Sequence, residues 1–419
     1  MKKFEKIIGF IIIIIILAAA KFWLKTDLLF FRLLMGTGLG YSLARAYTGF
    51  AGSVNRAYRT GSTKLMRTLM FMFFITALLM TAFLFGKDPA SYNLWIKPIN
   101  LGLILGGFLF GFGMSISVCC ASGVLTDLPQ ALPRAFTTLI FFMIGVFVGF
   151  PIQYTASWVQ DSWFSSYIGY RTMGGIFLPD LFQGDGFEGY LGGLLALAGL
   201  CLIFTILSYM YESYKKKTGQ YSGLEIENIQ ENLEPIDLKN FKLFSADTYY
   251  HLFEKPWTLK QGGIALAIIV TILMGVTGYG WGVSQPYGIW FGKILMFFGI
   301  SAQSLAEFTK LSAQTFRTPF FEHQISVQNF GILMGAIIYL LTAGKFIEFF
   351  NSELNISKKQ TLMYALGGLS MGFGTRLAQG CNVGALYTPI SNFSLSGWVF
   401  LIFMIVGGFV SNKFSEKIY

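Results

Sequence analysis

Charged residues are scarce in this chain. Only 12% of its 419 residues are Asp, Glu, Lys or Arg, whereas 54% are hydrophobic, and ordinary soluble domains carry about 25% charged residues. Most of the chain therefore has no polar face to present to water. This composition excludes a soluble globular domain and predicts an all-α polytopic membrane protein.

Metal ligands and cofactor motifs are scarce as well. The chain has two histidines and four cysteines, and neither histidine stands beside a cysteine, whereas closed zinc or iron–sulphur sites need about four N or S ligands. The sequence contains no Walker loop and no dinucleotide fingerprint. We therefore expect no metal site and no cofactor, and transport that is secondary or channel-like.

The positive charge lies at the ends of apolar runs. The net charge is +10, but the basic residues do not form a patch with interleaved aromatics, which argues against nucleic acid as a partner. Basic clusters at 2–6, 56–67 and 215–217 flank apolar runs, as cytoplasmic loops do under the positive-inside rule. We expect them in the cytoplasm and the chain in the inner (plasma) membrane, surrounded by the lipid bilayer; Lys413 and Lys417 leave the number of crossings open.

The apolar runs predict about eleven helical segments, several of them shorter than the roughly 20 residues that span hydrocarbon. We expect that some enter the membrane without crossing it. The first run resembles a secretory signal, but its alignment with the run that begins near Ile264 favours a retained first helix. The runs lie near 7–24, 28–48, 66–86, 98–118, 136–154, 189–211, 262–282, 289–305, 327–348, 360–377 and 395–411.

Two polar stretches divide the chain. Residues 157–189 combine acidic residues with several Trp and Tyr, which is typical of an outer interfacial loop. Residues 213–261 are too few for a domain with its own core, so we expect a cytoplasmic linker, with docking of a partner as the alternative. The predicted organisation is a first membrane unit at 1–212, this linker at 213–261, and a second membrane unit at 262–419.

One short phrase occurs twice, 261 residues apart. The phrase Gly-Gly-x-x-x-Gly-Phe-Gly begins at Gly106 and again at Gly367, and a cysteine follows each copy at the same offset, Cys120 and Cys381. This predicts two internally repeated units. Internal repeats in transporters commonly build one site near the membrane midplane from broken or re-entrant helices of both halves.

The glycines of the phrase favour a break in a membrane helix. Gly111 and Gly113, like Gly372 and Gly374, let backbones approach one another, and a broken helix is tolerated in hydrocarbon where its freed amides line a cavity or pack against protein. The N-terminus of such a helix would favour an anion. The alternative is that these glycines only permit tight helix packing.

Cys120 and Cys381 are candidate ligand residues, because the repeat would place them at equivalent positions in the two halves. Burial raises the pKa of a thiol in an apolar cleft, so each would act as a neutral S–H donor. Such donors suit a soft sulphur or selenium anion better than phosphate or sulphate. Cys119 is ambiguous, and Cys201, which has no counterpart, is expected to be an apolar filler.

The residues from Gly372 to Gly384, Gly-Phe-Gly-Thr-Arg-Leu-Ala-Gln-Gly-Cys-Asn-Val-Gly, resemble the signature of the YeeE/YedE family of sulphur-transport membrane proteins. The stretch that ends at Cys120 resembles a weaker first copy, and the resemblance covers roughly 28–155 and 289–411. It implies thiosulfate uptake through an hourglass-shaped protein with broken central helices and a relay of S–H···S contacts; other members are associated with selenium metabolism. By motif, Cys120 and Cys381 would form the relay, with Asn382 beside Cys381.

The family's other motif departs from its usual pattern here. It typically reads as an arginine, then Phe-Cys-Phe and a second arginine, but this chain lacks that cysteine. Thr48 and Thr309 stand near its place in the two copies and could offer hydroxyls, while Lys310 could attract an anion at one mouth. The candidate substrates are therefore thiosulfate, another sulphur or selenium species, or a related anion.

Three arginines are further candidates. Arg56 and Arg317 end this second motif in its two copies, where basic residues usually anchor a helix to the interface. Arg376 falls inside the second glycine phrase, where an intramembrane charge marks a pathway or a buried pair. Its counterpart in the first unit is Ser115, so any role of Arg376 would be asymmetric.

Three functions remain open. The leading one is a non-enzymatic transporter or channel for a small sulphur-containing, thiosulfate-like anion, or for a selenium species, with Cys120, Cys381 and the glycine phrases at a central constriction. The second is a membrane-bound sulphur-transfer protein that passes sulphur from a persulfidated cysteine to a cytoplasmic carrier protein. The third is a structural membrane scaffold whose cysteines are filler.

Overall fold

The computed structural model describes residues 2–232 and 242–418 of the chain. The described part is helical, and its only strand-like pairings are two isolated bridges. Seven of its helices are long and apolar enough to cross a membrane, which confirms the predicted all-α polytopic membrane architecture. They are α1 (Lys2–Ile14) continued by η1 (Ile15–Ala19) and α2 (Ala20–Trp23), α5 (Lys64–Leu84), α8 (Leu132–Thr155), α11 (Tyr190–Lys217), α14 (Leu259–Thr277), α18 (Gln324–Thr342) and α22 (Ser396–Ile418).

Other helices complete the described fold, and each predicted apolar run overlaps a helix. The three longest of these are α3 (Asp27–Ala46), α6 (Leu101–Ser117) and α20 (Lys358–Leu377). The shorter helices and turns of the membrane units are α4 (Gly52–Thr60), η2 (Pro89–Ser91), α7 (Gly123–Asp127), α15 (Gln285–Phe297), α16 (Ala302–Thr309), α17 (Ala313–Arg317), η5 (Phe320–Glu322), α19 (Phe346–Ser352), η6 (Asn382–Tyr387) and α21 (Thr388–Ser391).

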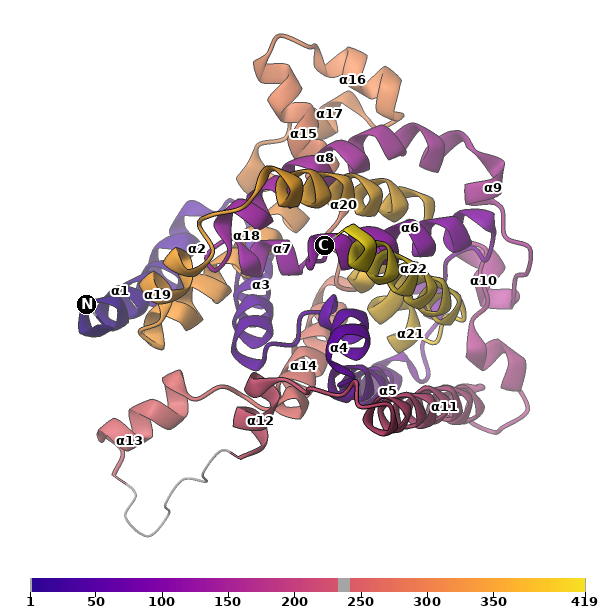
Figure 1. The fold of residues 1–419 in the computed structure, drawn as a ribbon. Helices are drawn as coiled ribbons and strands as arrows, with labels where there is room; N and C mark the ends of the chain where they lie inside the picture. Colours follow the sequence, from indigo (N-terminus) through magenta and orange to yellow (C-terminus); the bar gives the residue numbers. More distant parts are fainter. Residues whose placement is uncertain (1, 233–241, 419) are drawn as a thin grey trace.

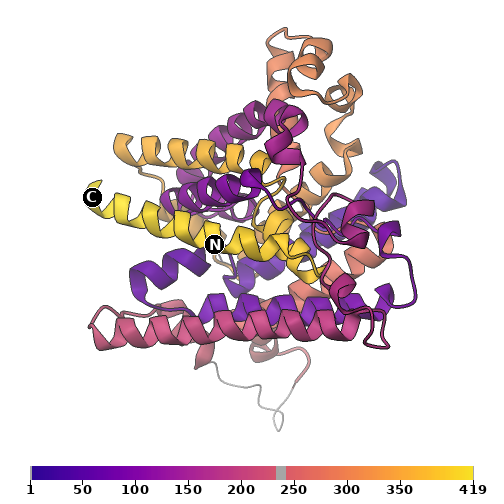
Figure 2. The ribbon, with the colours of Figure 1, turned by 90° about the vertical axis from the view of Figure 1, so that its right-hand side faces the viewer.

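The two polar stretches also carry short helices. The predicted outer loop holds α9 (Ser157–Gln160), α10 (Tyr167–Arg171) and η3 (Leu178–Phe182), and the predicted linker holds α12 (Glu225–Glu231), α13 (Ala246–Tyr249) and η4 (Tyr250–Glu254). Positions 233–241 of the predicted linker are not among the residues that the structure describes. In Figure 2 the axes of the long helices α5, α11, α20 and α22 are roughly aligned with one another, while α15 to α17 project at the top of Figure 1.

A group of four helices forms the centre of the fold. Helix α20 packs on α8 and on α6, and α22 packs on α6. A Cβ placed on Gly106 would lie 2.7 Å from the Gly374 carbonyl oxygen, and a Cβ on Gly113 would lie 2.3 Å from the Gly367 carbonyl oxygen. The start of each phrase therefore meets the end of the other, and α6 and α20 run antiparallel.

The Gly-Phe-Gly residues lie inside these helices. A Cβ on Gly111 would lie 2.0 Å from the Met404 carbonyl oxygen of α22, and a Cβ on Gly372 would lie 2.3 Å from the Phe142 carbonyl oxygen of α8. The expectation that these glycines break a helix is therefore wrong. They lie inside continuous helices, and because they have no side chain, the neighbouring helix can pack closely against them.

The breaks come after the two phrases. Helix α6 ends at Ser117 and is followed by Val118 with φ 54°. Helix α20 ends at Leu377, and Gln379 has φ 55°. Left-handed residues reverse the chain direction at a helix end. After each break the cysteine lies in a loop that precedes a short helical segment, α7 after Cys120 and η6 after Cys381.

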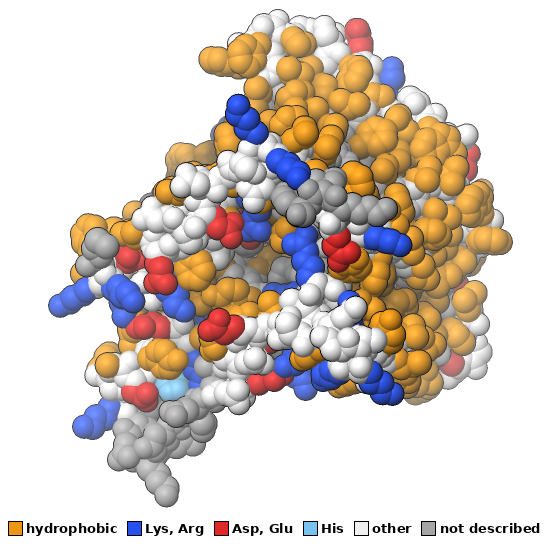
Figure 3. Space-filling model, in the orientation of Figure 1, with side chains coloured by type: hydrophobic (Ala, Val, Ile, Leu, Met, Phe, Trp, Pro, Cys, Tyr) orange, Lys and Arg blue, Asp and Glu red, His pale blue; other side chains and the backbone are white. Residues whose placement is uncertain are grey.

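The outer surface separates polar from apolar side chains. Figure 3 shows Lys, Arg, Asp and Glu side chains on the left and at the centre of the view, around a hollow, whereas the right-hand side is largely apolar. Large hydrophobic residues on α8 and α11 are exposed, such as Phe136, Leu195 and Ile203. An apolar flank beside a polar face fits a chain that sits in a bilayer.

Candidate functional site

The two breaks bring Cys120 and Cys381 into one buried cluster. Their side chains are 1% and 0% exposed. Tyr287 of α15 donates its hydroxyl to the Ala121 carbonyl oxygen at 2.7 Å and is within electrostatic reach of Cys119, Cys120 and Cys381. The two cysteines are also within electrostatic reach of each other. Loops at opposite ends of two antiparallel helices therefore converge.

Hydrogen bonds fix the loops around these thiols. The Gly123 amide donates to Cys120 Sγ at 3.3 Å, and Ser122 Oγ lies 3.6 Å from the same sulphur. In the other unit, Asn382 Nδ2 donates to Met114 Sδ of α6 at 3.0 Å. Asn382 thus anchors the loop of Cys381 to the helix that precedes Cys120, while its own Oδ1 has no partner.

A cavity of about 480 Å³ lies beside the loop of Cys381. Arg376 lines it and is 3% exposed; its guanidinium donates to Ser284 Oγ at 2.8 Å and to Gln153 Oε1 at 3.2 Å. The cavity wall also includes Gly380 and Gly384, which flank Cys381. A desolvated guanidinium whose partners are neutral keeps its attraction for an anion.

Lys97 is a second buried cation in this cavity. Its Nζ donates to the carbonyl oxygens of Gln379 and Gly384, and it lies 5.1 Å from the centre of the Trp95 ring. Lys97 lies outside the membrane-spanning helices, and burial, together with the nearby charge of Arg376, lowers the pKa of Lys97 to about 7, against a smaller opposing effect of Cys381. Among the residues that the structure describes, no carboxylate is close enough to neutralise either cation.

An aromatic cluster packs in the same core as the two cysteines. The rings of Trp281 and Tyr387 have centroids 6.0 Å apart, Phe50 lies 6.2 Å from Trp281, and Phe73 lies 5.9 Å from Tyr387. The Tyr387 hydroxyl lies 2.8 Å from Thr76 Oγ1. These side chains exclude water from this part of the core, which strengthens polar contacts such as that of Tyr387 with Thr76.

The two candidate threonines, Thr48 and Thr309, lie in different surroundings. Thr48 is buried in the loop between α3 and α4, and its hydroxyl has no hydrogen-bond partner. The backbone of Ala51 in the same loop hydrogen-bonds the Cys120 thiol. Thr309 lies in α16, donates to the Leu305 carbonyl oxygen at 2.7 Å, and belongs to the projecting group α15 to α17.

The remaining candidates of this motif lie apart from the cysteines. Lys310 and Arg317 are exposed on the projecting group, whereas Arg56 is largely buried against the linker. Two residues near the thiols, Lys97 and Tyr287, were not predicted from the sequence. A lone lysine beside Trp95 at the start of an apolar run was the available signal for Lys97; Tyr287 carries no local signal.

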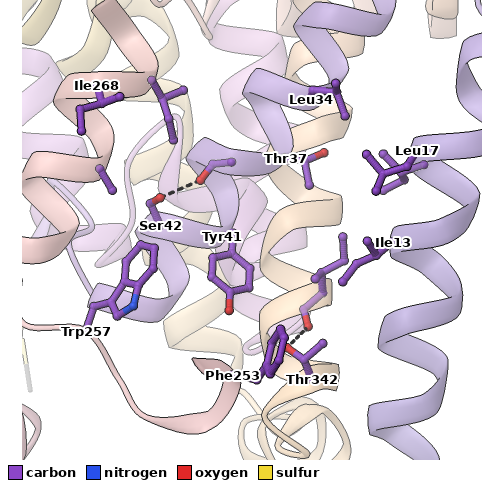
Figure 4. A pocket seen from close by; sticks show the side chains of 15 residues that line it. Ile13, Leu17, Leu34, Thr37, Tyr41, Ser42, Phe253, Trp257, Ile268 and Thr342 are labelled. Atoms are coloured by element: carbon purple, nitrogen blue, oxygen red, sulfur yellow. Dashed lines mark hydrogen bonds between the residues drawn. The ribbon is translucent and has the colours of Figure 1, made fainter. Parts of the chain in front are cut away.

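A second cavity, of about 510 Å³, is unsuited to an anion. Figure 4 shows its wall, which is formed mainly by apolar side chains from the first helix, α3, α14 and α18. The hydroxyls of Thr37, Ser42 and Thr342 in this wall donate to carbonyl oxygens of their own helices. The wall therefore offers few free donors. The cavity of Lys97 and Arg376 instead places two buried basic side chains beside the loop of Cys381.

The chain is similar in sequence to several transporter proteins. The chain is 28% identical over 170 residues to "Probable transporter YedE" of Escherichia coli, a match that covers 39% of this chain and 40% of that protein's length. It is 24% identical over 343 residues to "Thiosulfate transporter TsuA" of Spirochaeta thermophila, covering 80% of this chain and 84% of that protein. It is 22% identical over 377 residues to "Thiosulfate transporter TsuA" of Escherichia coli, covering 90% and 91%. The sequence profile of the Sulphur transport family matches residues 45–410, and the chain therefore belongs to this family.

Proposed function

We propose that the protein is a membrane transporter for a small sulphur-containing anion such as thiosulfate. One observation carries the proposal: a cavity with two buried, unneutralised cations opens beside the loop of Cys381, and this loop meets the loop of Cys120. The similarity to two thiosulfate transporters supports the choice of substrate class.

The cavity would accept the anion first. Lys97 and Arg376 supply positive charge in a site from which water is largely removed, so an anion gains attraction in exchange for part of its hydration. The hydroxyl of Ser284 and the amide of Gln153 line the same cavity as further polar groups. These two neutral groups can contact the anion without adding further positive charge, so the anion can still leave the cavity.

The two thiols would then pass the anion along. The anion would leave the cavity by contacting the thiol of Cys381 and would then contact the thiol of Cys120. Thiols are weak donors, and conduction needs sites that bind well enough to admit an ion and weakly enough to release it. Transfer of sulphur to a cytoplasmic carrier protein fits less well, since Cys119, Cys120 and Cys381 are at most 1% exposed.

An uptake assay tests the proposal. Radiolabelled thiosulfate uptake is measured in cells that lack their own transporter, and the amount of inserted protein is checked by immunoblot. A neutral hydrogen bond contributes about 1 kcal/mol, so Cys381→Ala and Cys120→Ala should each slow uptake about fivefold. Cys201→Ala, in α11, is the matched control and should leave uptake unchanged. Wild-type uptake in the Cys120→Ala, Cys381→Ala double variant would rule out the thiol path.

A further inference from the structure

We infer that Arg56 and Ser62 form a second anion-binding site of the transport path, on the linker side of the two cysteines, and that the carboxylate of Glu227 occupies this site in the present conformation. The inference rests on the proposed function, because the competing ligand is the transported anion. The linker would thereby act as a built-in competitor of that anion.

The carboxylate of Glu227 has the contacts expected of a bound anion. Arg56 Nη1 donates to Glu227 Oε1 at 3.0 Å, and Ser62 Oγ donates to Glu227 Oε2 at 2.5 Å. The Glu227 side chain is 2% exposed and that of Arg56 is 16% exposed. A guanidinium and a hydroxyl in a partly desolvated site are donors that also suit a small oxyanion.

The position of Arg56 connects this site to the path. Its Nη2 donates to the Tyr47 carbonyl oxygen at 2.6 Å, at the start of the loop between α3 and α4. Within that loop Thr48 has a buried hydroxyl without a partner, and the backbone of Ala51 hydrogen-bonds the Cys120 thiol. One short loop therefore joins the arginine to the neighbourhood of the thiol.

The linker is held in place by contacts of its own. Gln230, one turn after Glu227 on α12, donates Nε2 to the carbonyl oxygens of Ala46 at 2.9 Å and Trp257 at 2.7 Å. The Ser222 amide donates to the Thr60 carbonyl oxygen at 3.0 Å. Glu231 of α12 also pairs with Lys64. These contacts are polar and lie at the edge of the fold, where α12 is drawn in Figure 1, so α12 can separate without unfolding the membrane helices.

Occupation by Glu227 has a direct consequence for transport. One guanidinium edge cannot bind the carboxylate and a second anion at the same time. An anion that leaves Cys120 on this side must therefore displace Glu227, and the rate of release depends on the strength of the Glu227–Arg56 contact.

Binding of sodium thiosulfate to the purified full-length protein tests this inference. Glu227→Gln keeps the size of the side chain but removes its charge, and we expect thiosulfate to bind about tenfold more tightly, which corresponds to about 1.4 kcal/mol. Glu231→Gln is the matched control, because it lies on the same helix and pairs with Lys64 at 2.7 Å, not with Arg56 or Ser62. Adding Arg56→Gln to Glu227→Gln should abolish the gain.

A second variant and a second measurement distinguish failure of the linker site from misfolding of one variant and from failure of the proposed function. Gln230→Ala loosens α12 from outside the site and should also tighten thiosulfate binding. In a Cys119→Ala background, both variants should speed maleimide labelling of Cys120 in inverted membrane vesicles, which needs no substrate. If wild-type protein does not take up thiosulfate, the proposed function fails. If uptake is present but neither variant alters binding or labelling, the linker site is refuted.

Discussion

Ser370 donates its hydroxyl to the carbonyl oxygen of Leu109 at 2.9 Å, and these two residues are 261 positions apart. This is the offset between the two glycine phrases. Equivalent residues of two repeats can touch only close to the axis that relates the repeats. Since α6 and α20 run antiparallel where these residues meet, we propose that the predicted repeats are related by a two-fold axis across the helices, as an inverted repeat.

The first prediction concerns the helix packing around this contact. Gly111→Ala should lower the free energy of unfolding by about 1–3 kcal/mol, because its Cβ would press on the backbone of α22. A Cβ on Gly199 of α11 meets nothing within 4 Å, so Gly199→Ala is the control and should be neutral or slightly stabilising. Thermal unfolding in detergent measures both; equal melting temperatures would show that the close approach is not needed.

The second prediction concerns pH. Because the pKa of Lys97 is lowered to about 7, this lysine is charged below pH 7 and neutral above it. Anion binding in the cavity should therefore weaken as the pH rises through about 7. Lys97→Arg keeps the charge at every accessible pH and should flatten the profile. Thiosulfate binding measured from pH 6 to pH 8 checks this, and an unchanged slope in the variant would exclude Lys97 as the titrating group.

The third prediction compares equivalent positions of the two units. Arg376→Gln removes a buried charge without a carboxylate partner, so it should reduce thiosulfate affinity about tenfold, as expected for a hydrogen bond to a charged group. Ser115→Ala, at the counterpart position, removes a buried hydroxyl that has no partner and should leave affinity and stability nearly unchanged. Similar losses in both variants would show that the site is more symmetric than the cavity suggests.

The sequence predicted the helices well because a long apolar run has few other structures in a bilayer. It could not place the breaks. Glycine permits both a helix break and close helix contact, and only the neighbours of Gly111 and Gly372 in other helices decide between the two. The loops of Val118 and Gln379 carry left-handed residues that have no glycine signal.

The candidate site was predicted in part for the same reason. Cys120 and Cys381 were found through the repeated phrase, and their convergence depends on loops folding back around Tyr287, which the repeat alone does not specify. Thr48 and Thr309 occupy equal places in the sequence, yet α15 to α17 project away and remove Thr309 from the thiols. Lys97 was missed because a single lysine near a helix end usually anchors to the interface.

The last prediction concerns selectivity. Thiols are weak donors and cannot replace the water that sulphate must shed, whereas a terminal soft sulphur or selenium atom has a looser hydration shell. Unlabelled thiosulfate and selenium analogues with a terminal soft atom should therefore compete strongly with labelled thiosulfate, and sulphate should compete poorly. In the Cys120→Ala, Cys381→Ala variant this discrimination should disappear, while weak binding to Lys97 and Arg376 remains. If sulphate and thiosulfate inhibited the wild type equally, the protein would select anions by charge alone, and the cysteines would take no part in selection.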